Sequence, residues 1–230
     1  MNRILSFVAT LCLLHVAQAQ FVYPRMEDHD HEPGVYTEDP FITHYRKEFF
    51  AVFQGDVPRF KKAYGEIQAM VAKNPRDARA LVWLGNGQTI EAGMLKLKGK
   101  KPEAEALLKT SRVTMDRAVS LKPKDPNIYM MQAATLYIQG QYWPESLITQ
   151  AAWRELRDDC LRFIKYLGPK MARASTHVRD ETYGELGIAY LKLGQKDQAK
   201  SAFEKIIQFD PKSEYAVRAH REITKLRLKS

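Results

Sequence analysis

The sequence predicts an all-α protein built from antiparallel helix pairs. Apolar residues recur at helical spacing along most of the chain, and glycine or proline falls between these stretches. Hydrophobic residues make up 45% of the 230 residues, which is enough to build a core. The sequences NPRD at 74–77 and KPKDP at 122–126 each separate one unit from the next, with Asp77 and Asp125 as expected helix caps. This repeated punctuation indicates stacked helical units rather than a sheet.

The clearest unit covers residues 183–211, which form two apolar stripes on either side of a turn at Gly194. Gly187 and Ala199 are small, so two helix backbones can approach closely there. Pro211 ends the second stripe because proline does not continue a helix. The first stripe consists of Leu186, Tyr190 and Leu193, and the second of Ala199, Ala202, Phe203, Ile206 and Ile207.

This stretch resembles a tetratricopeptide repeat, whose pattern places particular residues at fixed offsets. Tyr183 stands where the family has Trp, and Ile206 stands where a small residue is usual. The resemblance implies a right-handed superhelical solenoid of about three to four such units plus a capping helix. The residues that carry it are Tyr183, Leu186, Gly187, Tyr190, Gly194, Ala199, Phe203 and Pro211.

Three further helix pairs are expected before this repeat, and a lone amphipathic helix at 213–228 is expected after it as a polar cap. The second pair is longer than the ~34 residues of the family, with extra length around residues 96–102. An interruption of the solenoid at that point is therefore left open. Gly140 is expected at the turn of the third pair. The pairs are expected at 41–54 and 60–74, 77–96 and 102–121, and 126–139 and 144–167.

Residues 1–19 are predicted to be a secretory signal peptide. Arg3 supplies the positive start, residues 4–16 are mostly apolar but too short for a membrane span, and Ala-Gln-Ala at 17–19 is a small-x-small cleavage site. A retained membrane anchor is the alternative. Lipid attachment at Cys12 is disfavoured because Leu11 stands where a small residue is needed. The protein is expected to be exported to the periplasm or beyond, most consistently with a bacterial envelope, and no later stretch is apolar enough to hold it in a bilayer.

Residues 20–40 are expected to form a flexible acidic arm ahead of a helical domain at 41–228. The arm has no apolar period, and its six carboxylates oppose only Arg25, which gives a formal charge of −5. Since the whole chain carries +9 and Arg3 contributes one positive charge, residues 41–230 carry a formal +13. The arm is either a solvated tether or a segment that folds back on the basic domain and competes with a partner. Anionic lipid heads, envelope polymers and acidic proteins are the expected partners of the basic surface; nucleic acid is not expected in an exported protein.

Two features that could indicate metal or thiol chemistry, the sequence at 28–32 and Cys160, are not expected to provide it. The sequence DHDHE at 28–32 offers imidazoles and carboxylates, but its i, i+2 spacing on an arm does not arrange a tetrahedron, so no metal or cofactor is expected. Signal cleavage leaves Cys160 alone, so no intramolecular disulfide can form. The thiol lies in a helical pattern and is expected to be a buried apolar group, with a nucleophile or an intermolecular disulfide as alternatives.

The sequence contains no phosphate-binding loop, no His-Glu-x-x-His, no paired-cysteine signature and no nucleophile elbow. We therefore expect a non-catalytic adaptor or scaffold that binds a protein or peptide. An accessory subunit of an envelope transport or secretion assembly is the alternative of the same class. An unrecognised enzyme is the alternative of another class, and a polar pocket that places Cys160 beside His177 would favour it.

The resemblance also implies a concave groove, lined by the first helix of each unit, that takes an extended peptide or a helix. Its residues here are mostly apolar, so an apolar or aromatic segment of an envelope or secreted protein is the expected ligand. A clamp for a carboxyl terminus is disfavoured, because Val82 and Gly184 stand where the clamp lysine would be. The alternative is that several of these residues belong to the core. The implied groove residues are Tyr45, Phe49, Val52, Val82, Asn86, Thr89, Met130, Ala134, Tyr137, Gly184, Ile188 and Leu191.

Overall fold

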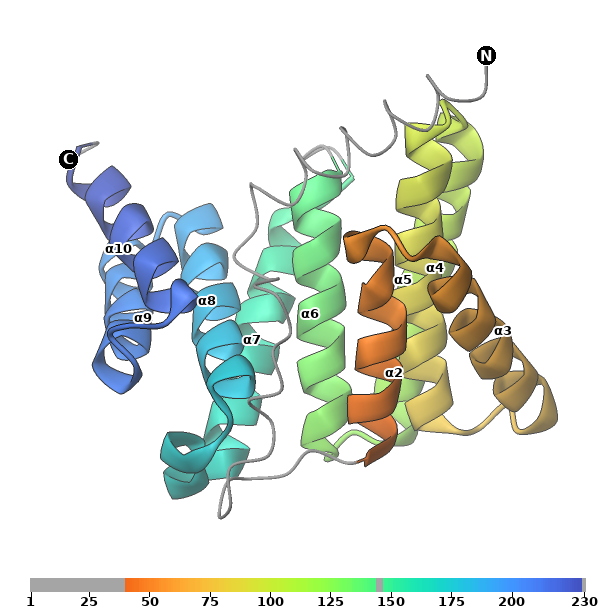
Figure 1. The fold of residues 1–230 in the computed structure, drawn as a ribbon, viewed down its shortest axis with the longest axis horizontal. Coiled ribbons are helices and arrows are strands. Elements are labelled where there is room, and N and C mark those ends of the chain that lie inside the picture. Colours follow the sequence, from red (N-terminus) through yellow and green to blue (C-terminus); the bar gives the residue numbers. More distant parts are fainter. Residues whose placement is uncertain (1–39, 144–146, 229–230) are drawn as a thin grey trace. The chain divides into compact units, whose positions relative to one another are not determined.

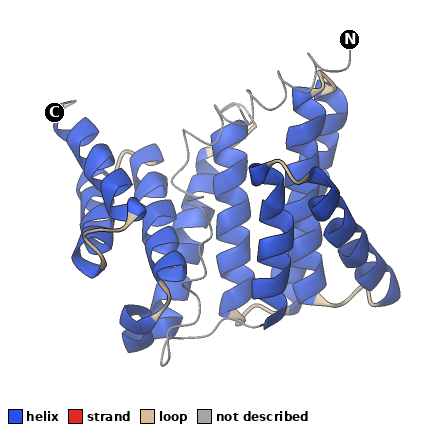
Figure 2. Cartoon of the chain, viewed as in Figure 1, coloured by secondary structure: helices blue, strands red, loops and turns tan. Residues whose placement is uncertain are grey.

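The computed structural model describes residues 40–143 and 147–228, and every regular element within them is helical (Figure 2). Successive α-helices pack against one another as neighbouring pairs, so the predicted all-α architecture is confirmed. The handedness of the solenoid stays a prediction. The signal peptide at 1–19, the arm at 20–39 and the metal-binding types at 28–32 lie outside the described residues.

Contacts divide the described chain into two compact units, which we call the first unit (residues 40–131) and the second unit (residues 132–228). The division falls inside α6 (Pro126–Tyr142). Each unit has its own packing and is described by itself below. The single domain predicted over 41–228 stays a prediction.

The first unit begins its helices where the sequence places capping aspartates. The Asp56 carboxylate accepts a hydrogen bond from Arg59 N at 3.1 Å, and that of Asp77 accepts one from Arg79 N at 3.0 Å. Asp125 caps α6 in the same way, as predicted, through Asn127 N at 3.0 Å. The elements ahead of α6 are α2 (Pro40–Phe50), a 3-10 turn η2 (Ala51–Gln54), α3 (Val57–Lys73), α4 (Ala78–Leu97) and α5 (Lys101–Leu121) (Figure 1).

Aromatic rings fill the centre of the first unit. Phe49 of α2 is fully buried, and its ring centroid lies 5.3 Å from that of Phe60 and 4.9 Å from that of Trp83, both in edge-on geometry. Gly87 of α4 faces this cluster, because a Cβ placed there would lie 2.4 Å from the ring of Tyr64. The aromatic residues that the sequence places in three different helices therefore form one core.

Helices α4 and α5 form an uninterrupted hairpin, which resolves the question left open around residues 96–102. They contain 20 and 21 residues and are joined by a short turn in which Gly99 has φ +78°. Ser111 Oγ donates to the carbonyl oxygen of Gly85 at 2.7 Å, and a Cβ on Gly85 would lie 2.6 Å from Met115 Sδ. The extra length of this unit is therefore in the helices rather than in the turn.

The second unit corrects two details of the third predicted pair. Gly140 lies inside α6 rather than at a turn. A glycine is needed there because a Cβ would lie 2.0 Å from the Trp153 indole. The next helix starts at Gln150 rather than 144, because Thr149 Oγ accepts from Ala152 N at 3.4 Å and caps it. After α6 come α7 (Gln150–Leu167), a 3-10 segment η3 (Gly168–Arg173), α8 (Thr176–Lys192), α9 (Lys196–Phe209) and α10 (Glu214–Arg227) (Figure 1).

The ends of α7 and α9 follow the punctuation in the sequence. Gly168 has φ +50° and ends α7, as predicted, and α9 ends just before Pro211. The terminal helix α10 matches the predicted cap at 213–228. Among the helices of the described residues, none combines the length and the apolar character needed to cross a membrane.

Candidate functional site

The pair of helices predicted at 183–211 is formed by α8 and α9. Gly187 is required there, because a Cβ at this position would lie 2.3 Å from Cε1 of Phe203. Ala199 and Phe203 are fully buried in the contact, and Gly194 has φ +75° in the turn between the helices. The predicted close approach and the predicted turn are both confirmed. Helix α8 starts at Thr176, seven residues before the predicted start of this unit at Tyr183.

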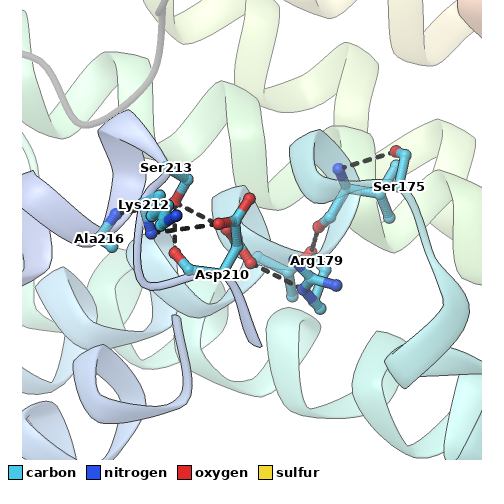
Figure 3. Close-up of polar contacts among 9 residues, drawn as sticks. Ser175, Arg179, Asp210, Lys212, Ser213 and Ala216 are labelled. Carbon is cyan, nitrogen blue, oxygen red and sulfur yellow. Dashed lines mark hydrogen bonds and ion pairs between the residues drawn. The ribbon is translucent and has the colours of Figure 1, made fainter. Parts of the chain in front are cut away.

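A polar network surrounds the first turn of α8 and the turn that precedes α10 (Figure 3). Ser175 Oγ caps α8 by accepting from Val178 N at 3.3 Å. Arg179 Nε donates to Asp180 Oδ1 at 2.8 Å, and Ser213 Oγ lies 3.4 Å from Asp180 Oδ2 as a donor. The same hydroxyl also lies 3.0 Å from the carbonyl oxygen of Asp210. The network thus joins the start of the α8–α9 pair to the start of the helix that follows it.

Asp180 is a buried carboxyl group with a raised pKa. Its side chain is fully shielded from solvent, and this burial raises its pKa from 3.8 to about 6. The nearby Asp210 carboxylate acts in the same direction, while Arg179 and Ser213 oppose the rise by bonding to the ionised form. Asp180 therefore titrates near neutrality although it is paired with a guanidinium.

The start of α10 is capped and also held against α8. Ser213 Oγ accepts from Ala216 N at 3.0 Å and caps α10. Tyr215 OH and His177 Nδ1 are 3.0 Å apart, and His177 Nε2 lies 2.9 Å from Glu181 Oε2. The capping helix is therefore held through its first turn by polar groups of α8.

Two further buried groups lie on α7 and α8. Burial raises the pKa of Glu185, 3% exposed, well above its ordinary value, and the negative charge of Glu181 raises it further. Burial likewise raises the pKa of the Cys160 thiol, with Glu185 as the next cause. A raised pKa keeps the thiol neutral, which is the opposite of the activation that a nucleophilic cysteine needs. Both ring nitrogens of His177 face Tyr215 and Glu181, so the hydrogen-bonded Cys160–His177 pair that would favour an enzyme is not formed.

The implied groove residues of the first unit lie in its interior. Phe49 and Val82 belong to the hydrophobic core, and Thr89 Oγ1 lies 2.8 Å from Ser111 Oγ in the α4–α5 contact. These side chains pack within the unit, and binding of a partner by them stays a prediction. The buried set comprises Tyr45, Phe49, Val52, Val82, Asn86 and Thr89.

The remaining implied groove residues divide into two groups. Ala134 and Tyr137 of α6 are buried, at 8% and 2% exposure, and Gly184 of α8 is buried as well. Met130 of α6 is half-buried against the core of the first unit. Ile188 and Leu191 of α8 are also half-buried and remain partly open to solvent. Binding of a partner by any of these residues stays a prediction.

The polar groups around the first turn of α8 were not predicted from the sequence. Residues 176–185 read THVRDETYGE and have no apolar stripe, so the periodicity became visible only at Leu186. The one local hint of these buried polar groups was that the polar residues lie directly before a helical apolar stripe, so the helix could extend back over them. The contacts that bury His177, Asp180 and Tyr215 come from different helices and have no mark in the local sequence. In the part of the chain that the structure describes, no group of three or more His, Cys, Asp or Glu side chains is arranged to hold a metal ion.

Comparison with known families identifies one match. Residues 180–213 match the family model described as tetratricopeptide repeat. The matched range begins at Asp180 and ends at Ser213, the two residues that the polar network brings together. The search of curated proteins finds no match to the chain. The all-helical fold and this match support a tetratricopeptide-like protein, and a repeat of this kind suggests a role in protein–protein interaction.

Proposed function

We propose that this chain is an exported, non-catalytic adaptor that binds a protein partner in the periplasm or outside the cell. The observation that carries the proposal is the match of 180–213 to a tetratricopeptide repeat, on a helix pair that is fully formed. Such repeats present a surface rather than a reactive centre. The secretory pattern of residues 1–19 supports the exported location.

The partner surface includes the open side of α8. Ile188 and Leu191 come from the predicted groove, lie one turn apart and are half-buried, so they offer apolar area without being locked in the core. A helix or extended segment with an apolar anchor is the ligand this surface fits.

Affinity capture from envelope extracts tests the proposal. The bait is the chain from residue 20 to 230, beside an Ile188→Ala/Leu191→Ala variant. A Val113→Ala variant serves as control, since Val113 is 69% exposed on α5 and lies outside the predicted groove. We expect one partner that the chain and the control retain and the α8 variant loses. A partner held equally by all three baits contradicts the α8 surface, and capture of no protein at low or physiological salt contradicts the adaptor.

A further inference from the structure

A basic and aromatic face follows the last turns of α7 into η3. We call it the basic α7–η3 face. Leu161 is 40% exposed, Tyr166 is 62% exposed and the Arg162 side chain is 58% exposed. Residues 161 and 162 share one side of α7 with residues 165 and 166, because each residue of the first pair lies three to five positions before each residue of the second. Lys170 and Arg173 follow in η3, directly after α7. The name covers Leu161, Arg162, Lys165, Tyr166, Lys170 and Arg173, all of which are solvent-exposed.

The positive charge of this face is not compensated along its own segment. From residue 160 to residue 179 the chain contains no Asp or Glu. The nearest carboxylate that contacts the face is Asp159, which is 1% exposed and bonds to Arg162 Nη1 at 3.2 Å. That contact orients the Arg162 guanidinium and does not involve Lys165 or Lys170. An acidic ligand could therefore pair with these lysines and also contact the ring of Tyr166.

A second lysine-rich segment of the described chain, between α4 and α5, has a nearby carboxylate and no aromatic side chain. The turn between α4 and α5 exposes Lys98, Lys100 and Lys101, but Lys100 Nζ lies 3.9 Å from Glu103 Oε1. Its exposed apolar residue is Leu97, and it has no aromatic side chain. This turn is therefore a natural control of similar charge.

Residues 20–39 have the complementary chemistry within the same chain. They carry a formal charge of −5, from six carboxylates and Arg25, and the acidic stretch is flanked by Tyr23 and Tyr36. A segment of 20 residues spans up to about 70 Å when extended. Because the segment belongs to the same chain as the face, docking is an intramolecular event, which favours the segment over a free partner with the same chemistry.

We propose that residues 20–39 dock on the basic α7–η3 face of their own chain, with carboxylates paired to Lys165, Lys170 and the two arginines, and with an aromatic ring packed on Tyr166. The docked segment occupies the face until a stronger acidic partner displaces it. This inference is independent of the α8 surface in the proposed adaptor function.

Zero-length carbodiimide cross-linking of the full mature chain tests the contact. This reagent forms an amide between a carboxylate and a lysine amine that touch, and mass spectrometry locates the pair. We expect links from residues 27–39 to Lys165 or Lys170, with a yield that falls by roughly tenfold between 50 mM and 500 mM salt. Mixing isotopically labelled and unlabelled chains separates links within one chain from links between chains. Links that reach Lys98 and Lys101 equally, or that form only between copies, overturn the proposal.

Lysine acylation rates provide a second measurement. A variant whose six acidic residues in 20–39 are changed to Asn or Gln leaves the helical units unaltered. We expect Lys165 and Lys170 to react at least about twofold faster in this variant than in the native chain, while Lys98 and Lys101 react equally in both. Equal rates at all four lysines overturn the proposal. So does protection of Lys165 and Lys170 that appears only with phosphatidylglycerol vesicles, because the face is then a lipid-binding surface.

Discussion

Three glycines of this protein lie where an aromatic ring occupies the space of a missing side chain. Gly187 faces Phe203, Gly140 faces Trp153 and Gly87 faces Tyr64, each with an imagined Cβ under 2.5 Å from the ring. In each case, a second helix comes close only because there is no Cβ. Glycine normally weakens a helix, and here the packing it permits outweighs that cost.

The first prediction concerns the contact between Gly187 and Phe203, which lies in the matched repeat. Gly187→Ala should lower the stability of the second unit by about 1–3 kcal/mol, since Phe203 is fully buried and has to move. Thermal unfolding followed by circular dichroism measures the effect. Gly93→Ala is the matched control: it is also a helical glycine, but nothing lies within 4 Å of its Cβ position. The free energy of unfolding of the Gly93→Ala variant should be unchanged or rise by up to about 1 kcal/mol. An equal loss of stability in both variants would contradict the packing argument.

The second prediction concerns the pH dependence caused by Asp180. Its pKa in the folded chain is about 6, above the ordinary 3.8, so folding favours the neutral acid. The stabilising contribution is complete below about pH 4 and is lost as the pH rises through 6. Between pH 4 and 7, the native chain should lose up to about 3 kcal/mol relative to Asp180→Asn, which cannot ionise. Urea unfolding at several pH values measures the difference, and parallel curves for the two proteins would show that Asp180 is not the titrating group.

At the level of elements, most helix starts have a short polar side chain as cap, although α5 and α9 have none, whereas close helix pairing depends on small residues and rings. Asp56, Asp77, Thr149, Ser175 and Ser213 each accept a backbone N–H in the first turn of a helix. Most of these caps join residues two or three positions apart, so they can be predicted from the local sequence. Ser213 adds a contact to Asp180, thirty-three residues away, and so connects the cap of α10 to the first turn of α8.

The third prediction concerns that cap. Ser213→Ala removes the acceptor for Ala216 N and the hydroxyl near Asp180, so α10 should open more easily by about 1–2 kcal/mol. Amide hydrogen exchange should become faster in α10 while α3 of the first unit is unchanged. Ser201→Ala, on the exposed side of α9, is the control and should leave exchange in α10 as it was. Faster exchange throughout the second unit would mean that the cap stabilises more than α10.

At the scale of the whole molecule, the chain combines two compact helical units with an N-terminal sequence of opposite charge. Tetratricopeptide-like packing makes each helix pair depend on its neighbours, so the surfaces left open at the ends and along the outer faces are the ones available to partners. The match at 180–213 lies wholly within the second unit.

The fourth prediction concerns the whole chain and its N-terminus. When residues 1–230 are expressed in a bacterial host, residues 1–19 should be removed, and intact mass should show a chain that starts at Gln20 in the periplasmic fraction. Changing Ala17 and Ala19 to Leu should block cleavage, because the site requires small residues. A full-length chain recovered from the membrane fraction in both cases would favour the retained anchor instead.

Local chemistry alone was sufficient to predict the class of fold, the positions of most helices and the α8–α9 pair. Proline, glycine and the capping aspartates act within one turn of the chain, and apolar periodicity shows which side of a helix is buried. The role of Gly140 was predicted wrongly because the local sequence does not distinguish a glycine in a turn from one under a tryptophan ring, and only Trp153, thirteen residues later, does so. The start of α7 was predicted at 144 rather than at Gln150, where the Thr149 cap begins the helix.

Tertiary contacts decided which of the periodic residues are core and which polar residues are buried. A helical stripe specifies a face but not whether a neighbour covers it, so Phe49 and Val82 could be either groove or core until Phe60 and Trp83 were placed beside them. The network of Asp180, Ser213, His177 and Tyr215 depends on two segments meeting in space, the first turn of α8 and the start of α10. Its partners are separated by more than thirty residues, a distance over which periodicity carries no information, whereas folding brings them within hydrogen-bonding range.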